Sequence, residues 1–75
     1  MVLTFAPIQT DLYVLKIKGK DEIRKFLAGL GFAEGAKISV ISEVNGNLIV
    51  SVKDTRVAIG KDLSNRILVS DKEEG

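Results

Sequence analysis

One stretch, residues 23–35 with the sequence IRKFLAGLGFAEG, carries the only strong helical pattern in a chain whose other apolar segments read as strands. Apolar side chains recur there at the spacing i, i+3, i+4 and i+7, which places them on one stripe of a helix. Burying four such side chains contributes roughly 6–12 kcal/mol, comparable to the net stability of a small domain. We therefore expect the stripe to be buried against the rest of the fold. Its residues are Ile23, Phe26, Leu27 and Leu30.

Glycines close the predicted helix rather than open it. Gly31 can adopt the left-handed backbone conformation that ends a helix, so we expect the helix to stop at about Leu30. Phe32 should then fold back onto Leu27, as in a Schellman ending. A phosphate-binding loop would instead place its glycines between a strand and the start of a helix, so Gly29 is expected to permit close backbone packing.

The remaining apolar segments are typical of short β-strands separated by polar turns. In the first of them, alternation places Tyr13, Leu15 and Ile17 on one face and two lysines on the other. The dipeptide at residues 45–46, Asn-Gly, is a strong hairpin signal, and we expect a second turn at residues 54–55. The predicted strands span residues 12–18, 36–44, 48–53, 56–59 and 67–70.

Smaller features complete the expected architecture. Gly35 belongs to the turn after the helix, and residues 60–66 are long enough for a single helical turn with Leu63 tucked inward. Residues 71–75 have no apolar anchor and are expected to form a mobile tail. About five strands and one helix predict a mainly β fold, a small and partly open barrel whose core receives the helix stripe.

Length and composition exclude several classes of protein. A chain of 75 residues is expected to form a single small domain. It contains no cysteine and no histidine, so we expect neither a disulfide nor a thiolate metal site, which fits a cytoplasmic protein. The net charge of +1 provides no strong field for nucleic acid or acidic lipid. Without a spanning apolar run or a signal peptide, we expect no direct membrane insertion and any membrane contact to pass through another protein.

Catalytic and metal-binding groups are equally scarce. Catalysis needs an activatable group held beside a second group that orients it, and no serine here has an evident activating partner. The carboxylates of Glu43, Asp54 and Asp62 lack the spacing of a calcium or magnesium loop. We therefore predict no catalytic residue, no cofactor and no metal ligand. A direct transition-metal site would have to consist wholly of carboxylates and backbone oxygens, which bind such ions weakly.

A nucleic-acid surface is the alternative we weigh for the lysines near the first strand and the helix start. Small barrels that bind nucleic acids usually add exposed aromatic side chains for base stacking. The aromatic side chains here are expected to lie mostly in the core, so we expect no nucleic-acid partner. The lysines are Lys16, Lys18, Lys20 and Lys25, and the aromatic residues are Phe5, Tyr13, Phe26 and Phe32.

Four apolar residues fall out of phase with the inward faces of the predicted strands, which would leave apolar area on the outer surface. In the explanation we favour, bulges shift the phase, or the helix and the lead-in at residues 4–11 cover these residues. The alternative is a partner surface. Self-association through an exposed strand edge is a separate alternative for so small a barrel. The four residues are Ile41, Ile49, Ala58 and Leu68.

Two blocks of the sequence read L-G-F-x-x-G at residues 30–35 and A-I-G-K-x-L-x-x-x-I-x-V at residues 58–69. These blocks resemble the FeoA family of small accessory proteins of ferrous iron transport. The likeness covers nearly the whole chain in order. The sequence departs from the family pattern at Glu34, where proline is frequent, and at Ser64, where a small alanine is typical.

The resemblance implies a barrel like the Src-homology-3 (SH3) domain, with the helix inserted after the first strand. It also implies a role beside FeoB, the membrane transporter for ferrous iron with a cytoplasmic GTPase domain. We expect a non-enzymatic protein that docks on FeoB or modulates it. The candidate contacts are Arg24 and Lys25 on the helix, Ile49 on a strand and Arg56 in a turn.

Overall fold

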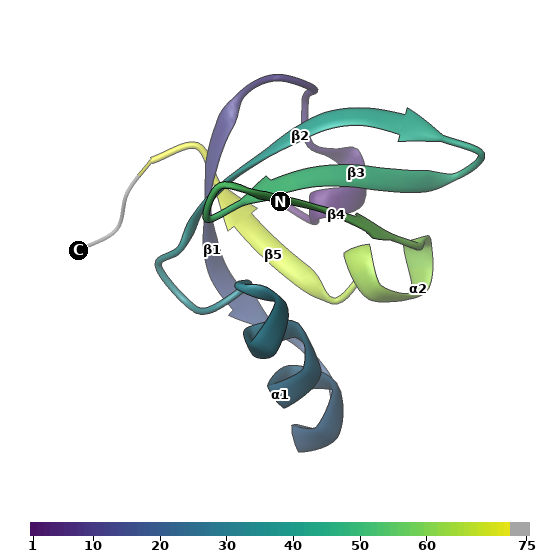
Figure 1. Cartoon of the computed structure of the whole chain (residues 1–75). Helices are drawn as coiled ribbons and strands as arrows, with labels where there is room; N and C mark the ends of the chain where they lie inside the picture. Colours follow the sequence, from purple (N-terminus) through teal and green to yellow (C-terminus); the bar gives the residue numbers. More distant parts are fainter. Residues whose placement is uncertain (73–75) are drawn as a thin grey trace.

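The computed structural model describes residues 1–72 as a five-stranded antiparallel sheet with the strand order β4-β3-β2-β1-β5 (Figure 1). The predicted mainly β architecture is confirmed, with a helix after the first strand and a short helix before the last. Of the predicted tail, residues 73–75 lie outside the described part of the chain. The elements are η1 (Leu3–Phe5), β1 (Asp11–Ile17), α1 (Asp21–Leu30), β2 (Lys37–Val44), β3 (Asn47–Val52), β4 (Thr55–Ile59), α2 (Lys61–Ser64) and β5 (Ile67–Ser70).

One apolar core fills the inside of the curled sheet. The strands send alternate side chains into it, because successive residues of a strand point to opposite faces. Leu3 of η1 and Leu27 of α1 reach the same core from outside the sheet and are fully buried. The buried apolar residues are Leu3, Leu12, Val14, Ile17, Leu27, Phe32, Ile38, Val40, Leu48, Val50, Val52, Ile59, Ile67 and Val69.

A β-bulge in β1 overturns our assignment of its faces. The pairing with β5 skips one residue between Val14 and Lys16, so Leu15 is the extra residue. Val14 is buried and Leu15 is 36% exposed, the reverse of the predicted alternation. Ile17 is nevertheless buried, because a bulge inserts one residue and so changes the phase on its far side. Tyr13 is half-buried.

The out-of-phase residues have two different fates. Ile41 is the extra residue of a second bulge, in the pairing of β2 with β3, so the favoured explanation by a bulge is confirmed for this residue. Leu68 is bridged by Val2, which extends the sheet beside it and leaves the Leu68 side chain half-buried on the outer face. Ala58 remains exposed and Ile49 half-buried, so the outer face of β3 and β4 keeps some apolar area.

Both hairpin turns require a left-handed backbone. Asn45 and Gly46 have φ of 51° and 83°, as the predicted hairpin turn demands. The turn between β3 and β4 lies at Lys53 and Asp54, one residue earlier than predicted. Their φ values are 48° and 65°, a conformation that neither lysine nor aspartate favours as glycine does.

The end of α1 confirms the predicted Schellman motif. Gly31 has a φ of 110°, and its amide donates to the carbonyl of Ala28 at 3.0 Å. The amide of Phe32 donates to the carbonyl of Leu27, also at 3.0 Å. These are the two hydrogen bonds that define the motif, so α1 ends at Leu30 as expected.

Candidate docking surface

The apolar stripe of α1 is only partly buried, and the prediction that all four side chains are buried is wrong. Leu27 is fully buried, but Phe26 is 56% exposed. Ile23 and Leu30 are half-buried and pack on the edge of the core. The reason is geometric, because α1 lies at one end of the curled sheet and projects away from it (Figure 1). One side of the stripe therefore faces solvent.

Two of the predicted contact residues lie beside this stripe. Arg24 and Lys25 are exposed on α1. The guanidinium Nη1 of Arg24 lies 3.5 Å from Oδ1 of Asp21, with 54% and 83% of the two side chains exposed. Such an exposed pair contributes little to stability, so both cations of α1 can turn toward a partner at low cost.

A first hollow, of about 430 Å³, lies between the end of α1 and the β3–β4 hairpin. Gly29 faces open space, because an added Cβ there would meet nothing within 4 Å. The expectation that Gly29 permits close backbone packing is therefore wrong. The hollow is mostly apolar and adjoins the exposed stripe. It is lined by Ala28, Gly29, Leu30, Gly31, Val52, Lys53, Thr55 and Val57.

A second hollow, of about 360 Å³, lies on the other side of α1. Ala28 lines both hollows, and Arg24 stands at the second one only. The end of α1 thus forms a ridge with a depression on each side, a shape that a protein surface can enclose. The second hollow is lined by Ile17, Arg24, Ala28, Phe32, Ala33 and Glu34.

The other two predicted contact residues lie on a different surface. Ile49 pairs with Ala58 and Ser51 pairs with Arg56, so these four side chains share the outer face of β3 and β4. Arg56 is exposed and Ile49 is half-buried. The four predicted contact residues therefore lie on two separate surfaces. Arg24 and Lys25 lie together on α1, and Ile49 and Arg56 lie together on β3 and β4.

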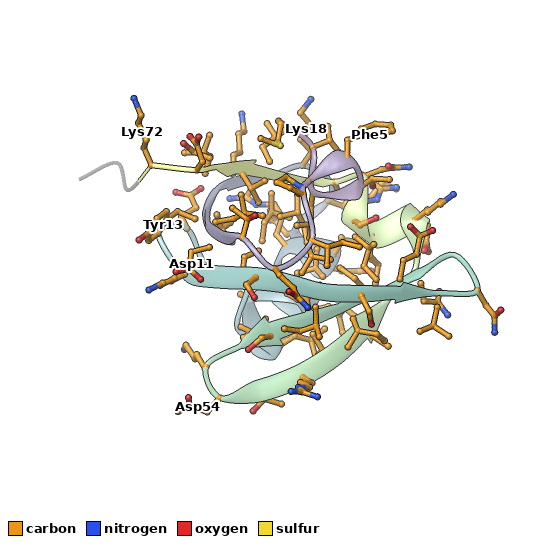
Figure 2. The ribbon with its side chains drawn as sticks, turned by 90° about the horizontal axis from the view of Figure 1, so that it is seen from above. Phe5, Asp11, Tyr13, Lys18, Asp54 and Lys72 are labelled. Carbon is orange, nitrogen blue, oxygen red and sulfur yellow. The ribbon has the colours of Figure 1, made fainter. Side chains whose placement is uncertain are left out.

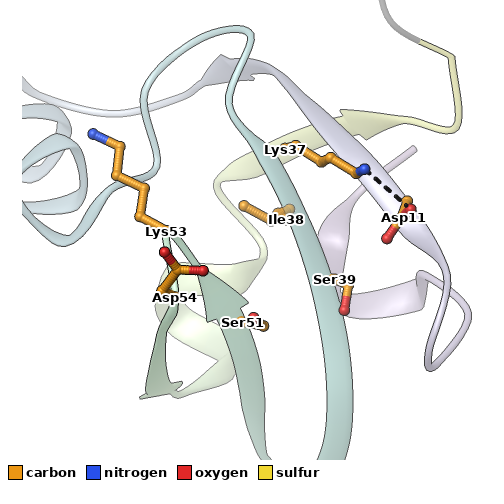
Figure 3. A pocket seen from close by; sticks show the side chains of 7 residues that line it. All are labelled: Asp11, Lys37, Ile38, Ser39, Ser51, Lys53 and Asp54. Atoms are coloured by element: carbon orange, nitrogen blue, oxygen red, sulfur yellow. Dashed lines mark ion pairs between the residues drawn. The ribbon is translucent and has the colours of Figure 1, made fainter.

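A third hollow, of about 280 Å³, is polar and lies across β1, β2 and β3 (Figure 3). Lys37 Nζ lies 3.4 Å from Oδ2 of Asp11 at its rim. Figure 3 shows the Lys53 side chain pointing away from that of Asp54. Charges of both signs line this hollow, so it has no strong preference for either a cation or an anion. Its residues are Asp11, Lys37, Ile38, Ser39, Ser51, Lys53 and Asp54.

Neither a cluster of potential metal ligands nor a helix able to span a membrane occurs within residues 1–72. Within that range, no group of three or more acidic, histidine or cysteine side chains is placed to hold a metal ion. No helix in the same range has the length and apolar character needed to cross a bilayer. The absence of a bound metal stays a prediction.

Comparison with known proteins identifies the family. The FeoA domain family matches residues 1–71. A protein of Methanocaldococcus jannaschii named "Putative Fe(2+) transport protein A" is 36% identical over 73 residues, covering 97% of this chain and 89% of that protein. This chain belongs to the FeoA family. The resemblance read from the two sequence blocks is thereby confirmed.

Solved FeoA structures share the fold. A crystal structure described as the iron uptake regulatory protein FeoA superposes with a TM-score of 0.85 at 33% identity, over 92% of each chain. FeoA of Stenotrophomonas maltophilia, complexed with zinc, has a TM-score of 0.80 at 26% identity and covers 93% of this chain and 89% of that one. That protein is described as a prokaryotic SH3 domain protein, which confirms the predicted SH3-like barrel.

Sequence reasoning missed the two most exposed aromatic side chains. Phe5 is 80% exposed and Phe26 is 56% exposed, so the prediction that the aromatic residues lie mostly in the core is wrong for both. Phe32 alone among them is fully buried. The length of α1 could have indicated that Phe26 is exposed. A helix of 10 residues that projects from one end of the sheet offers little area for burial.

Proposed function

We propose that this FeoA-family chain is a non-enzymatic accessory protein of ferrous iron transport that docks on a FeoB-type transporter at the cytoplasmic face of the membrane. Family membership supports the transport role, as do the names of its relatives. The observation that carries the docking role is the partly exposed apolar stripe of α1, with Phe26 its most exposed side chain and the first hollow beside Leu30. The S. maltophilia structure suggests for its own protein a role as a bacterial ferrous iron transport activating factor.

The proposed contact is an apolar centre with a basic edge. Exposed aromatic side chains commonly dominate binding energy when a partner buries them. Phe26 would supply such an anchor, with the half-buried Leu30 beside it. Arg24 and Lys25 would steer an acidic partner surface and set the orientation of docking. Ile49 and Arg56 lie on the separate outer face of β3 and β4 and would belong to a second contact.

The proposal is tested by binding of the purified protein to a detergent-solubilised FeoB-type transporter from the same source, with and without a GTP analogue. Phe26→Ser should weaken binding by about 30-fold, since a buried aromatic anchor contributes about 2 kcal/mol or more. Val44→Ser is the matched control, because Val44 is 51% exposed but lies at the end of β2 next to the distant β2–β3 turn. Equal affinity of Phe26→Ser and wild type would exclude α1 as the docking surface.

The basic edge has its own test. The double substitution Arg24→Glu and Lys25→Glu should weaken binding and slow association, with a larger loss at low ionic strength. Its folding is expected to be unchanged because both residues are exposed and the one ion pair that they form within residues 1–72 is a surface one. An association rate that stays the same at every salt concentration would remove these two residues from the interface.

Self-association is a second candidate, and one observation favours it. β4 ends the sheet order, and its outer edge has no partner strand within residues 1–72. Unpaired strand edges can bind the same edge of a second copy. Sedimentation across a concentration range decides the matter, and Ala58→Pro is the informative variant because the Ala58 amide faces away from β3, so proline removes one edge donor. A dimer that persists unchanged in this variant would rule out pairing through β4.

A further inference from the structure

The first residues of the chain extend the sheet past β5, so residues 1–5, β5 and β1 share one outer face. Val2 pairs with Leu68, and Leu68 pairs with Lys16 of β1. Paired residues of a sheet point to the same side. Leu68 points outward, because its neighbours Ile67 and Val69 are fully buried. Val2, Leu68 and Lys16 therefore form a row across the outer face.

Positive charges gather on this face, since β5 has no acidic residue and the one acidic residue of β1, Asp11, lies at the far end of that strand beside Lys37. Lys18 lies two residues beyond Lys16, and its amide donates to the carbonyl of Arg66 at 2.7 Å. Lys16 and Lys18 are exposed, and Arg66 is half-buried. The net charge of the whole chain is only +1, but the charge is unevenly distributed. The face is built from three segments that contain no aspartate or glutamate, residues 1–5, 15–18 and 66–70.

Phe5 adds an exposed aromatic side chain to this side of the molecule. It is 80% exposed, although Leu3 in the same turn is fully buried. The turn is held in place, because the hydroxyl oxygens of Thr4 and Ser64 lie 2.7 Å apart in a hydrogen bond. Figure 2 shows Phe5 and Lys18 projecting on the same side of the molecule. The exposed position of this large apolar side chain is therefore set by an ordered turn and not by a poorly held chain end.

We propose that this basic face, made of Val2, Phe5, Leu15, Lys16, Lys18, Arg66 and Leu68, binds the surface of a bilayer containing anionic phospholipids. Lysine and arginine near such a surface are attracted by the anionic headgroups. An exposed aromatic or aliphatic side chain beside them can enter the boundary between headgroups and acyl chains. The basic face presents both elements together, with Phe5 outermost.

The shape and chemistry of the face favour a lipid layer over other anionic partners. The three hollows described above are lined by other parts of the chain, apart from Ile17 at the edge of the second. A peptide that binds by insertion of its side chains would need such a hollow, whereas a bilayer surface does not. A single-stranded nucleic acid would stack successive bases on several aromatic rings, but Phe5 alone is aromatic among the residues of this face.

This contact goes beyond the proposed docking on a transporter and requires no transporter. It would hold the protein at the membrane surface by a face different from α1, leaving α1 free for the protein partner. Binding by only three basic residues and one aromatic anchor should be reversible and weak, because stable membrane attachment generally takes stronger combined signals.

The test is co-sedimentation of the purified full chain with vesicles of phosphatidylcholine, with and without phosphatidylglycerol. We expect binding only when phosphatidylglycerol is present, and loss of that binding at high salt. Lys16→Gln with Lys18→Gln should lower the partition coefficient by roughly 25-fold, at about fivefold for each cation removed. Phe5→Ser should lower it by roughly tenfold, the effect of removing a partly buried aromatic side chain.

The matched control removes two lysines from the polar hollow, in the variant Lys37→Gln with Lys53→Gln. It changes the net charge by the same amount and should leave vesicle binding within about twofold of wild type, because screening confines the attraction to cations at the surface. Equal losses in both double variants would overturn the proposal in favour of unspecific charge attraction. Binding to an oligonucleotide through Lys16 and Lys18, without binding to vesicles, would overturn it in favour of a nucleic acid.

The outcome is separable from that of the proposed function. Phe26→Ser tests the transporter contact in detergent, where no bilayer is present, and should leave vesicle binding unchanged. Phe5→Ser should affect vesicle binding and leave the detergent-solubilised complex intact. A variant that abolished both activities while the protein stayed folded would contradict the assignment of two separate faces.

Discussion

The strands and α1 differ in how completely their apolar side chains are buried. The inner residues of the strands, such as Val14, Val50 and Val69, are at most 1% exposed, whereas α1 buries only Leu27 completely. A sheet that curls on itself surrounds its inner face, but a short helix attached at one end can touch the sheet along one side only. The comparison shows where this small fold has apolar surface left over for binding.

The largest effect is expected where α1 meets the sheet. Gly31→Val should lower the free energy of unfolding by roughly 2–6 kcal/mol, combining backbone strain at a φ of 110° with overpacking. An added Cβ would collide with the side chain of Val52. Thermal denaturation should show a fall of at least several degrees in the melting temperature.

Gly29→Ala is the matched control for that junction. Gly29 is helical with open space around it, so the substitution should stabilise the protein by roughly 0.5–1 kcal/mol. If Gly31→Val and Gly29→Ala melted at the same temperature, the assigned helix ending would be incorrect.

The next effect separates two neighbours on α1. Leu27→Ala should cost about 2–5 kcal/mol, as for other buried leucines, whereas Phe26→Ala should stay within about 1 kcal/mol of wild type. Leu27 is fully buried and Phe26 is 56% exposed. Chemical denaturation of both variants measures the difference. Comparable losses would show that α1 packs more closely than described and would remove the basis for a docking surface on it.

The smallest effect concerns the two hairpin turns, which share a left-handed backbone but differ in sequence. Replacing Lys53 by Asn and Asp54 by Gly should raise stability by about 1 kcal/mol, because Asn-Gly suits positive φ at both positions. The same pair at Asn45–Gly46 already uses that chemistry. A double variant less stable than wild type in urea denaturation would mean that the Lys53 or Asp54 side chain makes a stabilising contact.

Much of the candidate site could not be predicted from the sequence, because it depends on contacts between distant segments of the chain. The order and type of the elements, the Asn45–Gly46 turn and the helix ending at Leu30 followed from local patterns, because backbone preference decides such features. The faces of β1 did not follow, since a bulge at Leu15 depends on pairing with β5. The exposure of Phe26 likewise depends on how far α1 overlaps the sheet.

The sequence by itself determined the family, the mainly β fold and the near absence of catalytic groups, because motifs, alternation and composition are local or additive properties of the chain. Only the tertiary structure decided which apolar and charged residues share a surface. Phe5, Lys16 and Arg66 are far apart in the sequence, and they lie on one face because the first residues of the chain and β1 both pair with β5. Long-range pairing sets the register, and the register sets which side chains face solvent.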